Sequence, residues 1–442
     1  MNAPGRSEAL VPESAPRRES AAASPARAQW LAWGGAVVVA ALLPFVFSSG
    51  ASLTMMSLMG FGIVFALSYN MLLGQTGMLS FGHAVYYGLG GFVTAHALNV
   101  VGAGRLPVPL PVMPLIGGLA GLFFALLLGW VSTKRAGTAF AMISLGIGEL
   151  VAACSLILRG FFGGEGGIST SRTKTLALFG LNFGPQIQVY YLIAAWTLLC
   201  IGAMYAFTRT PLGRMCNAVR DNPERAEFVG YNTQWVRYIM LVLSGFFAGI
   251  AGGLTALTYE IVTAETLNAY TSGAVLLMTF VGGIGFFYGP MIGAILIVIM
   301  QILVGGITHA WQLYFGLLFL FMVLRAPGGF ASLIAIQRRL YAAGLFGRVA
   351  PWYLVSGIPG ALMLVGLIGL IEMTYAALSD EEGEGAIATI KLLGEEYALN
   401  TFGPWLAAAA VTIAGYALLQ LANRRLFREW NGALATLQGD ND

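Results

Sequence analysis

Long apolar stretches recur along almost the whole chain, and no other feature restricts its fold as strongly. The hydrocarbon core of a bilayer is about 30 Å thick, so a helix needs about 20 predominantly apolar residues to cross it. Stretches near that length are Trp30–Phe47, Ala51–Leu73, Leu79–Val101, Val112–Val131, Thr138–Leu158, Val189–Phe207, Trp235–Thr258, Trp352–Met373 and Trp405–Leu421. Shorter or glycine-interrupted stretches are Thr271–Val281, Met291–Val304 and Trp311–Leu324. The sequence therefore predicts an all-α, polytopic integral membrane protein with about twelve transmembrane segments.

The composition excludes an ordinary soluble globule. Hydrophobic residues make up 57% of the chain and charged residues 10%, whereas soluble domains carry about 25% charged residues. The net charge of +3 gives no reason to expect nucleic acid as a partner, because membrane topology explains the basic residues. Cys154, Cys200 and Cys216 lack ligand-like spacing, so we expect no disulfide, no metal and no cofactor.

The distribution of lysine and arginine predicts the orientation, since cytoplasmic loops carry an excess of both. With a cytoplasmic N-terminus, most of the 23 basic residues fall inside, and those left outside are Arg105, Arg159, Arg172, Lys174 and Lys391. We therefore expect both termini in the cytoplasm. Residues 1–29 are polar and lack apolar periodicity, which predicts a disordered cytoplasmic tail rather than a cleaved signal peptide.

One polar stretch between two apolar spans, Arg209–Asn232, has helical periodicity of its own. Apolar residues recur there at three- and four-residue steps: Leu212, Met215, Cys216 and Val219. Arg214 and Arg220 then point away from the apolar face. The sequence Asp221-Asn222-Pro223 breaks the chain, and Asn222 can cap a second helix that ends before Gly230. Both helices are too short to be stable alone in water, so either lipid headgroups or a partner groove must hold them.

Glycines are placed where the spans must approach one another or break. Small residues let helices pack closely in a membrane, and they recur at Gly74, Gly77, Gly82, Gly88, Gly90, Gly91, Gly245, Gly249, Gly252 and Gly253. Non-helical backbone at membrane depth is tolerated only where it is buried in protein or lines a wet cavity. The runs Gly74–Ser80 and Gly282–Pro290 are candidates for such breaks and predict a pathway or hinge. For the second run, an ordinary short loop is equally compatible.

Polar side chains within the spans are costly and therefore informative. Glu149 lies near the middle of its span, and we expect it to face the protein interior, where it hydrogen-bonds a neighbouring helix or borders a translocation path. A second polar cluster consists of Asn70, Gln75, Ser80 and His83. We expect structural hydrogen bonds from these residues and assign no catalytic residue. The chain also lacks the phosphate-binding sequence G-x-x-x-x-G-K-[ST], so it cannot hydrolyse ATP by that route.

The chain resembles a known family in several segments. Glu224-Arg-Ala226 followed by Gly230 is similar to the EAA loop of bacterial ABC importer permeases, which begins Glu-Ala-Ala, although Arg225 replaces the first alanine. Further matches, in the family's order between about residues 50 and 335, are Asn70–His83, Thr138–Glu149 with Gly163–Gly167, Val281–Pro290, Tyr314-Phe-Gly and Arg325–Gly329. Together they resemble the M-type permease subunit of branched-chain amino acid-type ABC importers.

The resemblance implies a transport subunit at the inner membrane rather than an enzyme. Its partners would be two ABC ATPase subunits, a second permease subunit, a periplasmic or extracellular solute-binding protein and the membrane lipids. Residues implied in coupling to the ATPase are Leu212, Arg214, Arg220, Glu224, Ala226 and Gly230. Candidates for the translocation path or helix breaks are Asn70, Gly74, Gln75, Gly77, Ser80, His83, Glu149, Gly282, Gly283, Gly285 and Gly289.

The domain division and the solute stay open at this level. We expect a permease domain at 30–335 and, departing from the family pattern, an extension at 336–442 with two further spans and an acidic external loop within Ser379–Pro404. Branched-chain or related amino acids are the expected solutes, with urea or short amides as the alternative. An ion-coupled secondary transporter would need paired ionisable groups within its spans, and only Glu149 and Glu372 are there. A non-transporting scaffold is the remaining alternative.

Overall fold

The computed structural model describes residues 25–174, 182–308, 310–379, 389–392, 395–398 and 401–439. Residues 1–48 and 49–442 form two separate units. The first unit contains helix α1 (Pro25–Val46), which begins at Pro25 and so overlaps the end of the predicted tail. The rest of that tail lies outside the described residues.

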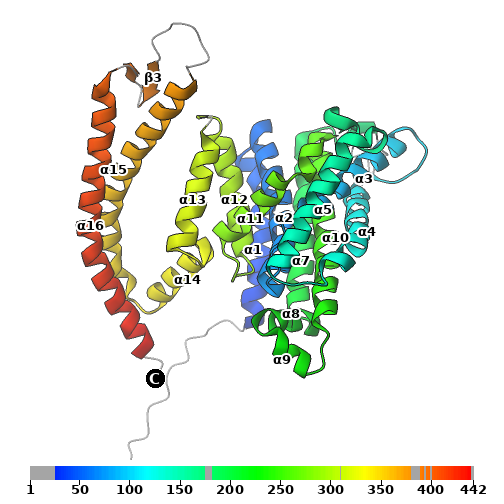
Figure 1. Cartoon of the computed structure of the whole chain (residues 1–442), viewed down its shortest axis with the longest axis horizontal. Helices are drawn as coiled ribbons and strands as arrows, with labels where there is room; N and C mark the ends of the chain where they lie inside the picture. Colours follow the sequence, from blue (N-terminus) through cyan, green and yellow to red (C-terminus); the bar gives the residue numbers. More distant parts are fainter. Residues whose placement is uncertain are drawn as a thin grey trace, which may run out of the picture. The chain divides into compact units, whose positions relative to one another are not determined.

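The second unit is built almost entirely of helices, as predicted (Figure 1). Its long helices are α2 (Gly50–Thr76), α3 (Ala84–Gly102), α4 (Met113–Ser132), α5 (Thr138–Ile157), α7 (Gln186–Thr208), α10 (Thr233–Tyr259), α15 (Phe346–Ser379) and α16 (Phe402–Gly439). Shorter helices are α6 (Arg159–Phe162), α8 (Pro211–Asp221), α9 (Pro223–Phe228), α11 (Ala269–Gly282), α12 (Gly289–Ile299), α13 (Trp311–Arg325) and α14 (Gly329–Ala342). Single turns are η1 (Leu110–Val112), η2 (Gly164–Gly166), η3 (Arg172–Lys174), η4 (Ala264–Leu267) and the π-helical turn η5 (Met300–Val304).

Every predicted apolar stretch overlaps a helix, but the helices differ in length. Among the described residues, seven helices are long and apolar enough to cross a membrane, or eight if α13 and α14, bent by 51° at their junction, form one span. Helices α11 and α12 are shorter. At about 1.5 Å per residue, the 14 residues of α11 reach only about two thirds of the way through the hydrocarbon core. Length and composition therefore do not establish the predicted number of twelve crossings.

Helices α3, α4 and α10 form the densest part of the second unit, and glycines bring them together. A Cβ built on Gly252 of α10 would overlap the carbonyl oxygen of Tyr87 in α3, and one on Gly249 would overlap that of Gly117 in α4. Such approaches exclude any side chain, so only glycine allows the three backbones to touch. The predicted role of these glycines in helix packing is confirmed.

Aromatic side chains mark one end of the α4–α10 pair. The Trp130 ring, in the last turns of α4, lies 5.2 Å from Trp235 and 5.4 Å from Tyr238 in the first turns of α10. Tryptophan and tyrosine concentrate at membrane–water interfaces. This end of the helices, next to α8 and α9, therefore lies at one membrane surface, which we call the α8–α9 face.

The opposite ends of α3 and α10 are covered by a short irregular layer. Strand β1 (Ile168–Ser169) pairs antiparallel with β2 (Ile261–Val262). Buried Arg172 donates hydrogen bonds to the carbonyl oxygens of Leu257 and Thr258 at the end of α10, at 3.1 and 3.3 Å. Because the last carbonyls of a helix lack partners within the helix, this arginine satisfies the end of α10. The sequence analysis assigned Arg172 only to a topology count.

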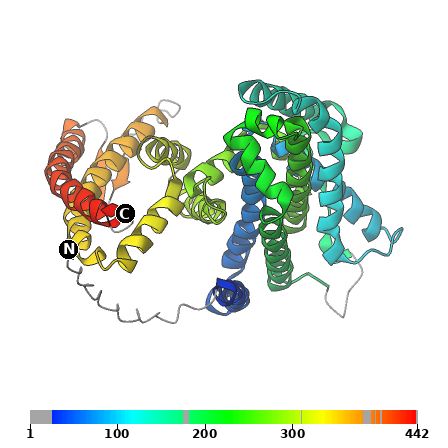
Figure 2. The same ribbon diagram turned by 90° about the horizontal axis from the view of Figure 1, so that it is seen from below.

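The C-terminal region is a helical hairpin. Helices α15 and α16 lie side by side in both views (Figures 1 and 2), and strands β3 (Thr389–Leu392) and β4 (Glu395–Ala398) pair near their ends. Two long apolar helices, α15 and α16, lie where the sequence predicts two further spans. Most of the predicted acidic loop lies outside the described residues. Helix α14 was not predicted, and the proposed domain boundary at 335/336 falls inside it.

Glu372 connects this hairpin to the rest of the unit. Its carboxylate accepts hydrogen bonds from the Thr308 and Tyr314 hydroxyls at 2.9 and 2.6 Å. A carboxylate within a membrane span is expensive unless it is paired. The two hydroxyls therefore attach α15 to the start of α13.

Candidate functional site

The polar stretch between α7 and α10 folds into α8 and α9, as predicted. The Thr210 side chain caps α8 by accepting a hydrogen bond from the Gly213 N–H at 3.2 Å. Asn222 caps α9 by accepting from the Arg225 N–H at 2.9 Å, with Pro223 at the first helical position. Gly230 follows α9 with φ of 93°, a conformation that favours glycine and ends the helix. Local sequence therefore determines both helices and both ends of α9.

The two helices expose different kinds of side chain. On α8, Cys216 and Val219 are buried whereas Arg214 is exposed, which confirms the predicted apolar face. Burial raises the pKa of the Cys216 thiol to about 12, so it stays protonated at neutral pH. Around the end of α9, Phe228 is 91% exposed and Val229 70% exposed. We call Phe228, Val229 and Tyr231 the apolar tip; the sequence analysis did not identify it.

The other residues implied in coupling lie on both helices. Ala226 is buried, Leu212 is half-buried, and Glu224 and Gly230 are exposed. The Glu227 carboxylate accepts a hydrogen bond from the Thr233 hydroxyl at 2.6 Å, which holds the end of α9 against the start of α10. The end of α9 is therefore fixed to the start of α10.

Arg220 was predicted to point away from the apolar face of α8, and its side chain also contacts the end of α2. Its guanidinium donates a hydrogen bond to the carbonyl oxygen of Gly74 in the last turn of α2 and forms an ion pair with Asp221 at 2.9 Å. The Gly74 carbonyl is among the last of α2, which have no partner within the helix, and a cation there also complements the helix dipole. The structure thus joins a residue from the predicted coupling group to one from the predicted break.

The first predicted break is real but shifted. Helix α2 continues through Gly74 to Thr76, and Gly77 ends it with φ of 70°. Residues Met78–His83 are non-helical, so α3 begins at Ala84 and not at Leu79 as the apolar stretch suggested. The Tyr69 hydroxyl donates to the Ser80 carbonyl at 2.9 Å, so this segment runs back along the last turns of α2. We call Gly77–His83 the broken segment.

Side chains from distant helices satisfy the backbone of the broken segment. The Phe81 N–H donates to the Ser144 hydroxyl of α5 and the Ala84 N–H to the Ser272 hydroxyl of α11, both at 3.0 Å. A Cβ on Gly82 would overlap the carbonyl oxygen of Ser144, so the segment rests directly on α5. Non-helical backbone is therefore tolerated here because protein surrounds it.

All four residues of the predicted polar cluster are buried. His83 Nε2 lies 3.0 Å from the Ser68 hydroxyl, and its ring stacks on Phe65 with centroids 5.6 Å apart. Asn70, Gln75 and Ser80 are also buried. Within the described part of the chain, Asn70 Oδ1, Gln75 Oε1 and His83 Nδ1 have no hydrogen-bond partner. Because an unpaired buried polar atom is costly, these atoms are the ones that a rearrangement or a bound solute would satisfy.

The second interruption is the turn between α11 and α12. Gly283 ends α11 with φ of 116°, and a Cβ on it would overlap the Gly328 carbonyl oxygen. A Cβ on Gly282 would overlap the carbonyl oxygen of Gly289, whereas a Cβ on Gly285 would meet nothing within 4 Å. A Cβ on Gly74 would lie 3.0 Å from the Ile284 carbonyl oxygen. The two predicted interruptions thus meet at the end of α2.

Glu149 does not face the interior of this chain, so that part of the prediction is wrong, and its place beside a translocation path stays a prediction. It is exposed on α5 and makes no hydrogen bond or ion pair with the residues that the structure describes. It belongs to an exposed stripe with heptad spacing: Ala139, Met142, Gly146, Glu149, Ala153 and Leu156. The neighbouring Gly148 is buried against the broken segment instead. A one-residue change of helical phase separates the two environments, and the sequence alone gave no reason to choose between them.

A polar hollow of about 520 Å³ lies at the membrane face opposite α8 and α9. We call it the Glu265 hollow. Its lining comes from α3, α10, β2, η4, α11, η5 and α13, and comprises Tyr87, Thr255, Tyr259, Ile261, Thr263, Glu265, Thr266, Asn268, Tyr270, Thr271, Gln301 and Gln312. The sequence analysis missed all of these residues, because seven elements contribute and no local pattern joins them.

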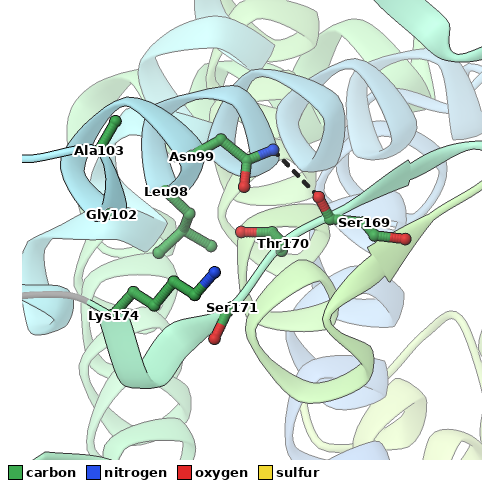
Figure 3. A pocket seen from close by; sticks show the side chains of 8 residues that line it. All are labelled: Leu98, Asn99, Gly102, Ala103, Ser169, Thr170, Ser171 and Lys174. Carbon is green, nitrogen blue, oxygen red and sulfur yellow. Dashed lines mark hydrogen bonds between the residues drawn. The ribbon is translucent and has the colours of Figure 1, made fainter.

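A second hollow, of about 390 Å³, lies beside β1 at the C-terminal end of α3 (Figure 3). Lys174 reaches into it between α3 and the Ser169–Ser171 segment, and the Asn99 amide donates to the Ser169 carbonyl at 3.0 Å. Among the described residues, the lining of this hollow carries a cation and no carboxylate, whereas that of the Glu265 hollow carries a carboxylate and no cation. Among the described residues, no group of three or more His, Cys, Asp and Glu side chains could hold a metal.

Comparison with known proteins yields a consistent set of similarities. Residues 51–326 match the family described as "Branched-chain amino acid transport system / permease component". The chain is 27% identical over 339 residues to the high-affinity branched-chain amino acid transport system permease protein LivM of Escherichia coli (strain K12), covering 71% of this chain and 77% of that one. The LivM protein of Salmonella typhimurium is 26% identical over the same shares. BraD of Pseudomonas aeruginosa is 24% identical over 60% of this chain and 89% of that one. No solved structure matches the chain.

Proposed function

Since the chain belongs to the family of branched-chain amino acid transport system permease components, we propose that it forms the translocation path of an ABC importer for branched-chain amino acids. Its membership and its apolar helices make it a multi-pass inner-membrane transport component. In this proposal, residues 30–335 form the permease domain and 336–442 an extension. Two ATPase subunits bind from the cytoplasm, a second permease subunit completes the path, and an external binding protein delivers the solute.

The observation that carries this proposal is the connection between α8–α9 and the broken segment. The apolar tip is exposed on a short helical pair that is too small to be stable by itself. From that pair, Arg220 reaches the end of α2, where the chain leaves the helix. A protein that binds the apolar tip is therefore connected to the broken segment by the hydrogen bond from Arg220 to the end of α2. The α8–α9 face is then cytoplasmic, which agrees with Lys134 and Arg135 following α4 at the same end.

Coupling also requires that the partner distinguish two states of the permease. A ligand shifts a conformational equilibrium only by its difference in affinity for the two states. In this proposal, closure of the ATPase pair moves α8 and α9 as one body, which changes the position of the α2 end and of the α11–α12 turn beside it. The solute path then opens alternately to the two sides.

The proposal is tested by crosslinking from the apolar tip. Phe228→Cys, treated with a short thiol-to-amine crosslinker in membranes that contain the whole transport system, is expected to capture an ATP-hydrolysing subunit. Leu106→Cys, also an exposed apolar position but at the opposite membrane face, is expected to capture none. Leucine uptake that continues when the ATPase partner cannot hydrolyse ATP would contradict the proposal and favour an ion-coupled transporter.

Glu149 supports a further part of the proposal, namely where the path runs. A carboxylate facing lipid at the centre of a span costs about 2.5–3.5 kcal/mol on insertion scales. Because Glu149 has no partner among the described residues, we place the exposed stripe of α5 toward the water-filled path between two permease subunits.

Replacing Glu149 by glutamine is expected to lower the initial rate of solute uptake several-fold and to leave the amount of assembled complex unchanged. The substitution keeps the shape and removes the charge, and no hydrogen bond to another described residue is lost. Leu150→Ala, at the adjacent exposed position, serves as the control and is expected to transport normally. Loss of assembly in Glu149→Gln would instead place this residue in a subunit contact.

A further inference from the structure

The Glu265 hollow has the composition of a site for a zwitterion. Glu265 is the one charged side chain among the described residues that line it, and no Lys, Arg or His joins it. The Gln301 and Gln312 amides lie on other elements of the same wall, and both side chains are exposed. A volume of about 520 Å³ falls within the range of about 300–1,000 Å³ that is usual for small-molecule sites.

The polar ends of these side chains are not used within the protein. In the described ranges, the Glu265 carboxylate and the Gln301 and Gln312 amides make no hydrogen bond to other residues. By contrast, Asn268 Oδ1 accepts from the Thr271 N–H at 3.0 Å, and the Thr271 hydroxyl donates to the Glu265 carbonyl at 2.8 Å. These two bonds fix the loop that holds Glu265 and do not involve its carboxylate.

Gln301 lies in a π-helical turn at the end of α12. π-Helical turns are rare, and those within helices occur frequently at functional sites. Here the turn places Gln301 on the wall of the hollow. The π-helical turn therefore supports a functional site independently of the charge and volume of the hollow.

The floor of the hollow leads to the broken segment. The Tyr87 hydroxyl lies 2.7 Å from that of Thr255, and the Tyr87 ring stacks on Phe65 with centroids 4.3 Å apart. Phe65 in turn stacks on His83 of the broken segment, and all three rings are buried. A solute in the hollow is therefore separated from the break only by a column of packed rings.

We propose that the Glu265 hollow is the outer solute site of the permease and that Glu265 binds the ammonium group of an amino acid. The amides of Gln301 and Gln312 are donors for the solute carboxylate, and the aliphatic side chain lies against Tyr87 and Tyr259. This inference rests on the proposed transport function and names its solute class. A urea-type solute has no charge, so it would gain little from Glu265.

The inference is tested by protection of a cysteine at the rim. Ile261, which lines the hollow from β2 and is 40% exposed, is replaced by cysteine in a Cys154→Ser background, because Cys200 and Cys216 are buried. Labelling by a charged, membrane-impermeant thiosulfonate is followed in nanodiscs that hold the whole complex. Leucine is expected to slow labelling, whereas 4-methylpentanoate, 3-methylbutylamine and urea are not. Tyr270→Cys is a second reporter should the first variant fold poorly.

Glu265→Gln is expected to raise the leucine concentration for half-protection about tenfold or more, because it removes a charge-assisted hydrogen bond. Glu265→Asp is expected to retain protection, and Glu165→Gln, an exposed carboxylate outside the hollow, to have no effect. Protection that survives Glu265→Gln, or protection by urea or by the desamino acid, overturns the inference. ATP-dependent leucine uptake is measured with the same complex in sealed proteoliposomes. Absence of uptake together with intact protection contradicts the proposed function and not the site.

Discussion

Replacing Arg220 with alanine is expected to reduce solute uptake by roughly ten- to hundredfold while the ATPase subunits stay bound and continue to hydrolyse ATP. The substitution removes the hydrogen bond from the guanidinium to the Gly74 carbonyl oxygen. Hydrogen bonds from charged groups contribute about 1.5–3 kcal/mol, and each 1.4 kcal/mol changes an equilibrium constant about tenfold. The measurement is the ratio of uptake to ATP hydrolysis in proteoliposomes that contain the complete system.

Two further variants separate this link from other roles of Arg220. Asp221→Asn removes the ion pair between side chains that are 38% and 66% exposed, and it is expected to have little effect, because surface pairs contribute about 0–1 kcal/mol. Arg220→Lys keeps the charge but only a single donor group, and an intermediate uptake is expected. A parallel fall of uptake and ATP hydrolysis in Arg220→Ala would show that the residue contacts the ATPase instead of linking α8 to α2.

Replacing Gly82 with valine is expected to abolish the folded protein. Any side chain at this position overlaps the carbonyl oxygen of Ser144, so the broken segment must move away from α5. That movement also breaks the hydrogen bond from the Phe81 N–H to the Ser144 hydroxyl. Overpacking alone costs about 1–3 kcal/mol, and an unsatisfied backbone group in the membrane costs several kcal/mol more. The measurement is the yield of monodisperse protein in mild detergent and its unfolding midpoint.

Gly146→Val is the matched control. Gly146 lies on α5 near Ser144, but nothing is within 4 Å of a Cβ built on it, so the folded protein is expected to survive. Any effect of Gly146→Val belongs to uptake, because this residue lies on the stripe that we place toward the path. Equal yields and unfolding midpoints for the two valine variants would contradict the packing that the structure shows for the broken segment.

These residues form one continuous connection between the two membrane faces. Arg220 bonds the end of α2, the broken segment follows, and Ser272 of α11 accepts from the Ala84 N–H where α3 begins. The rings of His83, Phe65 and Tyr87 continue to the floor of the Glu265 hollow. A displacement at α8 therefore has a packed route to the proposed solute site.

The features that local sequence predicted are those that depend on neighbours in the chain. The caps of α8 and α9, the end of α9 at Gly230 and the apolar face of α8 need only residues within about one helical turn. The close approach of α3, α4 and α10 was predictable from their glycines, because a glycine lets a neighbouring backbone come close whichever helix packs against it.

Predictions that required a direction in space were less successful. Glu149 was expected inside because a buried carboxylate finds a partner more easily than one in lipid. Yet α5 turns Gly148 toward the broken segment and Glu149 away from it. The first break was placed a few residues early, since Gly74 looks like a helix breaker in sequence but serves in the structure as a contact for the α11–α12 turn.

The sequence by itself determined that the chain is an all-helical integral membrane protein with a short helical pair between two spans, because apolar length, capping residues and turn residues act locally. Only the tertiary structure decided which distant groups meet: Arg220 with Gly74, the broken segment with α5 and α11, and the seven elements around Glu265. These contacts depend on the rotation of each helix about its axis and on the packing of its neighbours, and one residue's shift in that rotation exchanges a buried side chain for an exposed one.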